Sequence, residues 1–137
     1  MPKIFTSKNQ KFGEIGENIT CRFLMKHHFI ILDRNYTKKW GEIDIIAKNI
    51  KENKIHFIEV KSVSRNIKDV LCETLDTYRP EENVSSWKMK KMAKTIQVYT
   101  VSNRIPEWSK WQVDLIVVFI DLNNKKAKIK IISDLIL

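Results

Sequence analysis

Gly41-Glu42-Ile43-Asp44-Ile45-Ile46-Ala47, followed shortly by Ile55-His56-Phe57-Ile58-Glu59-Val60-Lys61, sets charged residues into two apolar, strand-forming runs. The polar residues 49–53 between the runs are enough for a turn, so the runs are predicted to pair as an antiparallel hairpin. A buried carboxylate normally takes up a proton unless a cation compensates it. Acidic residues kept in such runs therefore indicate a functional site.

The strand period predicts which of these charges meet. Side chains alternate between the two faces of a strand, so Glu59 and Lys61 are expected on one face together with Phe57. With the turn centred near residues 50–52, Asp44 falls opposite residues 57–59. One aspartate, one glutamate and one lysine are thus expected to converge within side-chain reach.

This triplet suits divalent-metal chemistry on phosphate. Asp44 and Glu59, with the backbone carbonyl of Val60 and waters, are candidate ligands for Mg²⁺ or Mn²⁺, since a hard cation of this kind takes few protein ligands and keeps several waters. Such a cation polarises a phosphodiester and supplies hydroxide. Lys61 is a candidate catalytic residue that orients the attacking water and offsets charge on the phosphoryl oxygens.

The same residues carry a family resemblance. Asp44 in one strand and Glu59-Val60-Lys61 in the next resemble the active-site signature of the PD-(D/E)XK nuclease superfamily. The surrounding motifs resemble, in order and over nearly the whole chain, those of the YraN-like family of small bacterial predicted endonucleases. They are Gly13-x-x-Gly16-Glu17, Arg34-Asn35-Tyr36, Gly41 to Ala47, Phe57 to Lys61 and Asp114-Leu115-Ile116-Val117. The resemblance implies a Holliday-junction-resolvase-like fold and metal-dependent endonuclease activity on DNA, including branched or otherwise structured DNA.

The resemblance adds further site residues. It implies that Glu17, on the first helix, is a further catalytic or metal-site acid, although helical spacing alone predicts an exposed Glu17. It also places a basic residue, Lys88, at the start of the second major helix, where a lysine supports phosphate binding. Glu42 and Asp114 join Lys88 as second-tier candidates, because Glu42 sits beside a turn and a buried Asp114 fits a hydrogen-bonded structural role as well as a catalytic one.

Two positions depart from the family pattern. An arginine commonly follows the Glu-x-Lys motif within two residues, whereas this chain continues Ser62-Val63-Ser64-Arg65. A basic residue often precedes the aspartate of the later strand, and here Gln112 stands near Asp114 instead. Phosphate binding near the strand that carries Glu59 and Lys61, and an ion pair to Asp114, are therefore left open.

The periodicity predicts a single α/β domain over residues 1–137, with the restriction-endonuclease-like αβββαβ order, a mixed central sheet flanked by helices, and an extra C-terminal strand. Apolar residues at Phe12, Ile15, Ile19 and Phe23 predict the first helix. The connection 63–86 contains another helical pattern, read as a lid or as a packed surface helix. Expected helices span 9–27 and 85/86–102, and expected strands span 29–36, 40–48, 54–62, 111–121 and 126–134.

Composition agrees with a nucleic-acid partner. The net charge of +9 and the pI near 9.6 favour DNA or RNA, although an AT-rich genome would also enrich lysine. The chain has 3 glycines, all near the acidic motifs, and the two in the helical pattern indicate close backbone approach. Its 2 cysteines, Cys21 and Cys72, have no metal-ligand spacing, and neither a signal peptide nor a membrane span is predicted, so a cytoplasmic protein is expected.

Other interpretations stay open at this point. The chain could be a non-catalytic nucleic-acid-binding or partner-docking module that keeps the nuclease fold. Lys61 could simply neutralise Asp44 and Glu59 in a structural ion-pair cluster. The tryptophans could stack on unpaired bases or pack in the core. His27 and His28 are expected to end the first helix rather than act as bases, and a homodimer would suit cleavage of two strands.

Overall fold

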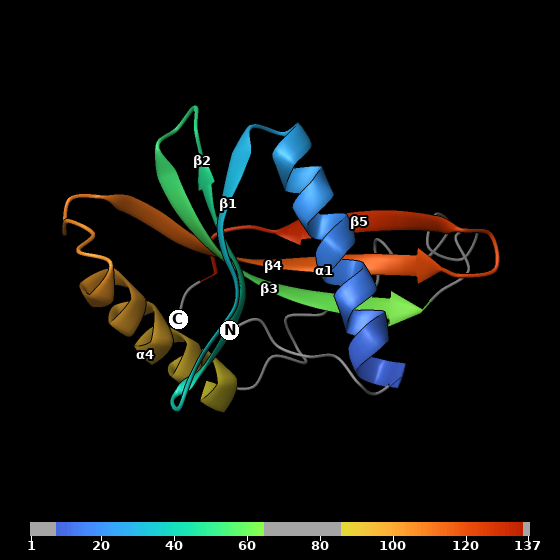
Figure 1. Cartoon of the computed structure of the whole chain (residues 1–137), viewed down its shortest axis with the longest axis horizontal. Coiled ribbons are helices and arrows are strands. Elements are labelled where there is room, and N and C mark those ends of the chain that lie inside the picture. Colours follow the sequence, from blue (N-terminus) through green and yellow to red (C-terminus); the bar gives the residue numbers. More distant parts are fainter. Residues whose placement is uncertain (1–7, 65–85, 136–137) are drawn as a thin grey trace.

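The computed structural model describes residues 8–64 and 86–135, which form a five-stranded mixed sheet with a helix against each face (Figure 1). The predicted α/β class and the order of elements are confirmed for these residues. The predicted helix and lid within 63–86, and Cys72, lie outside the described residues. The elements are α1 (Lys8–Lys26), β1 (Phe29–Lys38), β2 (Gly41–Asn49), β3 (Lys54–Ser64), α4 (Ser86–Ser102), β4 (Lys110–Asp121) and β5 (Lys126–Ile132).

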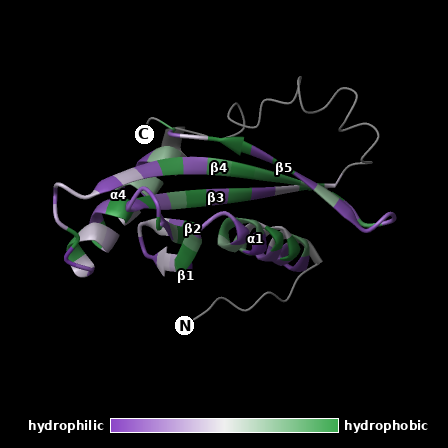
Figure 2. Ribbon diagram, turned by 90° about the horizontal axis from the view of Figure 1, so that it is seen from above, coloured by the Kyte–Doolittle hydropathy of each residue, from purple (hydrophilic) through white to green (hydrophobic). Residues whose placement is uncertain are grey.

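The sheet has the order β1-β2-β3-β4-β5. Neighbouring strands are antiparallel except β3 and β4, which run parallel from Lys54↔Lys110 to Ser64↔Ile120. Strand β4 is buried continuously from Val113 to Asp121, as expected for a strand covered on both faces. Figure 2 shows the sheet nearly edge-on, with hydrophobic residues running along β3, β4 and α1.

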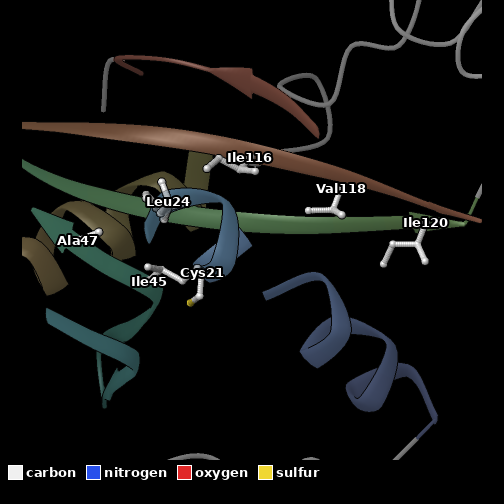
Figure 3. Packing of buried hydrophobic residues seen from close by; sticks show 8 residues of the cluster. Cys21, Leu24, Ile45, Ala47, Ile116, Val118 and Ile120 are labelled. Atoms are coloured by element: carbon white, nitrogen blue, oxygen red, sulfur yellow. The ribbon is translucent and has the colours of Figure 1, made fainter. Parts of the chain in front are cut away.

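Helix α1 packs on one face of the sheet, and most residues at the centre of this contact are small. Cys21 and Leu24 pack with strand residues of β2, β3 and β4, and Figure 3 shows Cys21 and Leu24 near Ile45. The predicted apolar stripe is wrong at Ile15, which is 39% exposed, whereas Gly16 and Thr20 are buried. Small side chains at the centre of the contact let the helix approach the sheet closely, so the larger residues Phe12, Ile19 and Phe23 flank the contact.

The glycines of α1 differ in their surroundings. A methyl group at Gly16 would overlap the hydroxyl of Ser62 on β3, whereas a methyl group at Gly13 would meet no atom within 4 Å. The close approach predicted from these glycines is therefore confirmed at Gly16 and wrong at Gly13. Cys21 is a buried free thiol, and neither described helix has the length and apolarity needed to cross a bilayer.

Helix α4 covers part of the opposite face. Met92, Ile96 and Tyr99 pack against β2 and β3 residues, including Ile46 and Phe57. Figure 1 shows α4 beside the tip of the β1–β2 hairpin, and β2 begins at Gly41. A Cβ atom there would lie 2.9 Å from Thr95 Oγ1 and 3.3 Å from the carbonyl oxygen of Lys91.

The β1–β2 hairpin changes faces halfway along its length. Ile43 packs in the core cluster of α4, but Ile45 packs in the cluster of α1, although strict alternation would put both on one face. On β1, Arg34 pairs with Ile45 and Tyr36 pairs with Ile43. The residue between them, Asn35, has a left-handed φ of 51°, a conformation that asparagine tolerates better than most residues. This kink lies beside Asp44.

Candidate active site

Strands β2 and β3 separate next to Asp44. This point of separation, with Asp44 on β2 and Glu59 and Val60 on β3, is here called the fork. The antiparallel ladder ends at Ile45↔Ile58, so Asp44 and Glu59 are the first residues beyond the last pair. The Oδ2 atom of Asp44 accepts a hydrogen bond of 2.9 Å from the backbone N–H of Val60. A side chain thus takes the place of the next ladder bond, and the predicted position of Asp44 opposite residues 57–59 is confirmed.

Glu17 reaches the same region from α1. It is 7% exposed, and its Oε1 lies 3.8 Å from Nη2 of Arg34 on β1. The exposed position predicted from helical spacing is wrong, because the buried face of α1 runs along Gly16 and Thr20 rather than along Phe12 and Ile15. Glu17 neighbours this face, so the helix carries an acidic side chain toward Asp44.

The electrostatics of Asp44 show that these acids are close together. Burial raises the pKa of the Asp44 carboxyl well above its ordinary value, and the negative charges of Glu59 and Glu17 raise it further, while the Val60 hydrogen bond lowers it. A cation bound beside these acids would lower the pKa of the Asp44 carboxyl.

The donor set fits a hard divalent cation. Asp44 and Glu59 offer carboxylate oxygens, and Val60 offers a carbonyl, because the N–H and C=O of one residue in a strand point toward the same neighbouring strand. Among residues 8–64 and 86–135, no group of three or more His, Cys, Asp or Glu side chains is arranged to hold a metal ion. A cation at the fork would therefore complete its shell with the carbonyl and water, as Mg²⁺ often does.

Lys61 follows Glu59 on the same strand. Lys61 is half-buried, and the alternation of side chains along a strand puts it on the same face as Glu59. Phe57 and Val63, which belong to the same alternating set, pack in clusters away from α1. The predicted common face of Glu59 and Lys61 thus agrees with the packing. Lys61 therefore lies next to the fork and outside the paired, apolar part of β2 and β3.

Sequence reasoning missed the roles of Arg34, Asn35 and Ser62. Within the described residues, Arg34 Nε, Asn35 Oδ1 and Ser62 Oγ are buried atoms with no hydrogen-bond partner. Buried polar atoms are rarely left in this state without a reason such as a bound ion, ligand or water. The available signal was the Arg34-Asn35-Tyr36 motif, which places a cation and an amide inside a strand.

Asp114 has a structural position. Burial by itself would raise the pKa of its carboxyl, but hydrogen bonds from His56, the Asp134 N–H and Gln112 lower that pKa overall. The distances are 2.6 Å to His56 Nδ1, 2.6 Å to Gln112 Nε2 and 3.0 Å to the Asp134 nitrogen. The polar partner of Asp114 is thus His56, which forms a hydrogen bond to it from β3 and not from the β4 position considered in the sequence.

The remaining candidates lie at the margins. Glu42 pairs with Thr37 at the hairpin end of β2. Lys88 belongs to the first turn of α4, and its side chain is outside the described part of the structure. His27 bonds through Nδ1 to the Phe23 carbonyl at 2.8 Å, and His28 has a φ of 68°, so both end the helix as predicted.

The tryptophans have different environments. Trp108 is 79% exposed, so core packing is wrong for this residue. Trp111 is 46% exposed and packs edge-on against Phe57. Trp40 is partly buried at the β1–β2 turn.

Comparison with known proteins places this chain in a family. A family model described as "Uncharacterised protein family UPF0102" matches residues 16–118, which include the fork, Glu17 and Asp114. A UPF0102 protein of Campylobacter hominis is 39% identical over 119 residues, covering 87% of this chain and 89% of the relative. UPF0102 proteins of Campylobacter jejuni subsp. doylei (41% identity, covering 77% and 81%) and Campylobacter lari (39%, covering 80% and 85%) are also similar.

Proposed function

Because this chain belongs to the UPF0102 family and carries the Asp44 fork, we propose that it is a metal-dependent endonuclease that hydrolyses phosphodiester bonds in DNA. The observation that carries the proposal is the Asp44 carboxylate, which accepts a hydrogen bond from the Val60 N–H beside Glu59. Burial, together with the charges of Glu59 and Glu17, raises the pKa of this carboxyl. The order of the described elements, α1, β1, β2, β3, α4 and β4, agrees with the αβββαβ order that the resemblance to PD-(D/E)XK nucleases implies, and β5 follows as an extra strand. Branched or structured DNA is the proposed substrate.

In this proposal the residues of the chain divide the chemistry among them. Asp44, Glu59 and the Val60 carbonyl would hold Mg²⁺ or Mn²⁺, which when bound polarises the scissile phosphate and lowers the pKa of water. Lys61 orients the attacking water and offsets negative charge on the phosphoryl oxygens. Glu17, fixed by Arg34, adds a third negative charge beside Asp44 and so strengthens the attraction for a divalent cation.

The test is cleavage of branched, single-stranded and duplex DNA by the wild type, with Mg²⁺ or Mn²⁺ and with EDTA. Glu59→Gln keeps the size of the side chain but removes an anionic ligand, so the cleavage rate is expected to fall by about 100-fold. Glu52→Gln is the matched control, because Glu52 is an exposed residue in the β2–β3 turn.

Two outcomes would count against the proposal. Equal cleavage by wild type and Glu59→Gln would show that the chemistry lies elsewhere. Salt-sensitive DNA binding that needs no metal, with no cleavage of any substrate, would favour the non-catalytic binding module instead.

A further inference from the structure

A second charged feature lies at the β1–β2 turn. The Nζ atoms of Lys39 and Lys94 stand 4.6 and 4.5 Å from the ring centroid of Trp40, and Lys38 Nζ stands 5.1 Å from the ring of Tyr36. These five residues, Tyr36, Lys38, Lys39, Trp40 and Lys94, are here called the cation–aromatic patch. Through the contact of Lys94 with Trp40, the patch joins α4 to the β1–β2 hairpin, whose tip lies beside that helix in Figure 1.

Ring contacts connect part of the patch to the hydrophobic core. Tyr36 packs edge-on against Tyr99, and Tyr99 packs edge-on against the core residue Phe57. The absence of a side chain at Gly41 brings the hairpin against Lys91 and Thr95, one turn of α4, so Trp40 reaches Lys94. The position of the Tyr36 ring is therefore fixed by the core, while the Trp40 ring contacts the ammonium groups of Lys39 and Lys94.

The charged residues of the patch itself are all lysines, and Glu42 is a nearby acid at the hairpin end of β2. Helix α4 contains four lysines and no acidic residue, and the turn adds Lys38 and Lys39. The ammonium groups of Lys39 and Lys94 share one ring, so they are at most about 9 Å apart. Like charges at this spacing repel one another within a Debye length of about 8–10 Å, and an anion between them would remove that repulsion.

We propose that the cation–aromatic patch binds the phosphodiester backbone of nucleic acid without reading its sequence. Lysine ammonium groups act as point charges for phosphate and fix position rather than base identity. The Trp40 ring is engaged by two cations, so its part is to hold them and not to stack on a base. This inference rests on the proposed action on DNA.

The patch stands at a defined separation from the fork. Gly41 and Asp44 are three residues apart on β2, which corresponds to about 10 Å of strand. One strand of a DNA duplex rises about 3.4 Å per nucleotide, so a backbone that runs along β2 would span this separation in about three nucleotides. A contact at this distance aligns the substrate without touching the reacting group.

The experiment measures the affinity of the full chain for two fluorescent 20-base-pair DNA duplexes of unrelated sequence, in EDTA, from about 50 to 300 mM KCl. Lys39→Gln and Lys94→Gln are each expected to reduce the slope of log K against log salt by about 0.9. Trp40→Leu, which keeps every charge, is expected to weaken binding several-fold, and Trp40→Phe less so. Lys51→Gln, at the opposite end of β2, is the matched control and should leave the slope unchanged.

The result that overturns the inference is a set of patch variants that behave like Lys51→Gln. Affinities that differ by more than about tenfold between the two duplexes would overturn sequence-independent binding. If Trp40→Leu does not fold, the two lysine variants decide the question by their slopes. Because metal is absent, the inference stands or falls separately from cleavage: a protein that cuts nothing but loses salt slope at Lys94 supports the patch and contradicts the nuclease.

Discussion

Asp44→Asn is expected to reduce metal-dependent cleavage by about 1000-fold or more and, without metal, to make the protein more stable than the wild type. The amide oxygen of asparagine still accepts the Val60 N–H bond, so the fork keeps its geometry. The substitution removes a buried negative charge that Glu59 and Glu17 repel. A catalytic loss with a gain in stability is the signature of a charge retained for function.

The dependence of stability on pH follows from the raised pKa of Asp44. Since the folded-state pKa of Asp44 is raised above its ordinary value of 3.8, the folded protein binds this proton more tightly than the unfolded chain. The contribution of Asp44 to stability therefore declines as pH rises from 3.8 through the raised pKa, and it is restored as pH falls. Asp114 has a lowered pKa and acts in the opposite sense, since its stabilisation is lost as pH falls below the ordinary range.

The measurement is thermal unfolding at several pH values above 4, in EDTA and with Mg²⁺ or Mn²⁺. In EDTA at neutral pH, Asp44→Asn should raise the free energy of unfolding by on the order of 1 kcal/mol or more, and melting should become less dependent on pH. Added metal should stabilise the wild type, since a ligand of the folded state does so by mass action, but not the variant. Asp134→Asn is the control, because Asp134 is exposed and its φ of 57° suits asparagine. A wild type that is unaffected by metal, or a variant that is less stable in EDTA, would contradict this account of Asp44.

Gly16→Ala is expected to lower the free energy of unfolding by about 1–3 kcal/mol, the usual cost of an added group in a packed contact. The new methyl group would overlap the Ser62 hydroxyl, so α1 or β3 must move. Cleavage should fall as well, since the next residue on α1 is Glu17. Gly13→Ala has open space around the new methyl group, and it should instead gain up to about 1 kcal/mol from the helix propensity of alanine.

Urea or thermal unfolding of the two variants provides the comparison. The double variant Gly16→Ala/Ser62→Gly removes the overlapping hydroxyl and should recover part of the loss. Equal changes in stability at Gly13 and Gly16 would show that the contact with Ser62 does not limit the approach of the helix.

The elements of the described fold were predictable because their periodicities are strong. The β2–β3 hairpin, and with it the position of Asp44 opposite Glu59, followed from two alternating runs and a short polar turn. The buried face of α1 did not follow, because hydrophobicity points to Ile15 while the contact is made by Gly16, Thr20 and Cys21. A close helix–sheet contact selects small residues, which an apolar pattern does not register.

The rest of the site depends on tertiary pairing. His56 and Asp114 are 58 residues apart and meet because β3 and β4 pair in parallel, a register that local sequence does not specify. The change of faces at Asn35 depends on one left-handed residue, so alternation predicts the wrong neighbours for Ile43. The Arg34 contact with Glu17 follows from the same kink and could not be read from spacing.

The fork also divides the sheet into parts that differ in how easily they open. Beyond Ile45↔Ile58, the outer half of β2 pairs only with β1 among the strands that the structure describes, and Ile43 of this two-stranded ribbon packs in the core cluster of α4. A two-stranded ribbon is marginal by itself, and segments with few partners open at a lower free energy than the core. The ribbon ends at Asp44 and carries Trp40 near its tip. The part of the sheet that can most readily adapt its shape to a rigid, extended polymer is thus the part that carries the proposed contact and adjoins the proposed chemistry at Asp44.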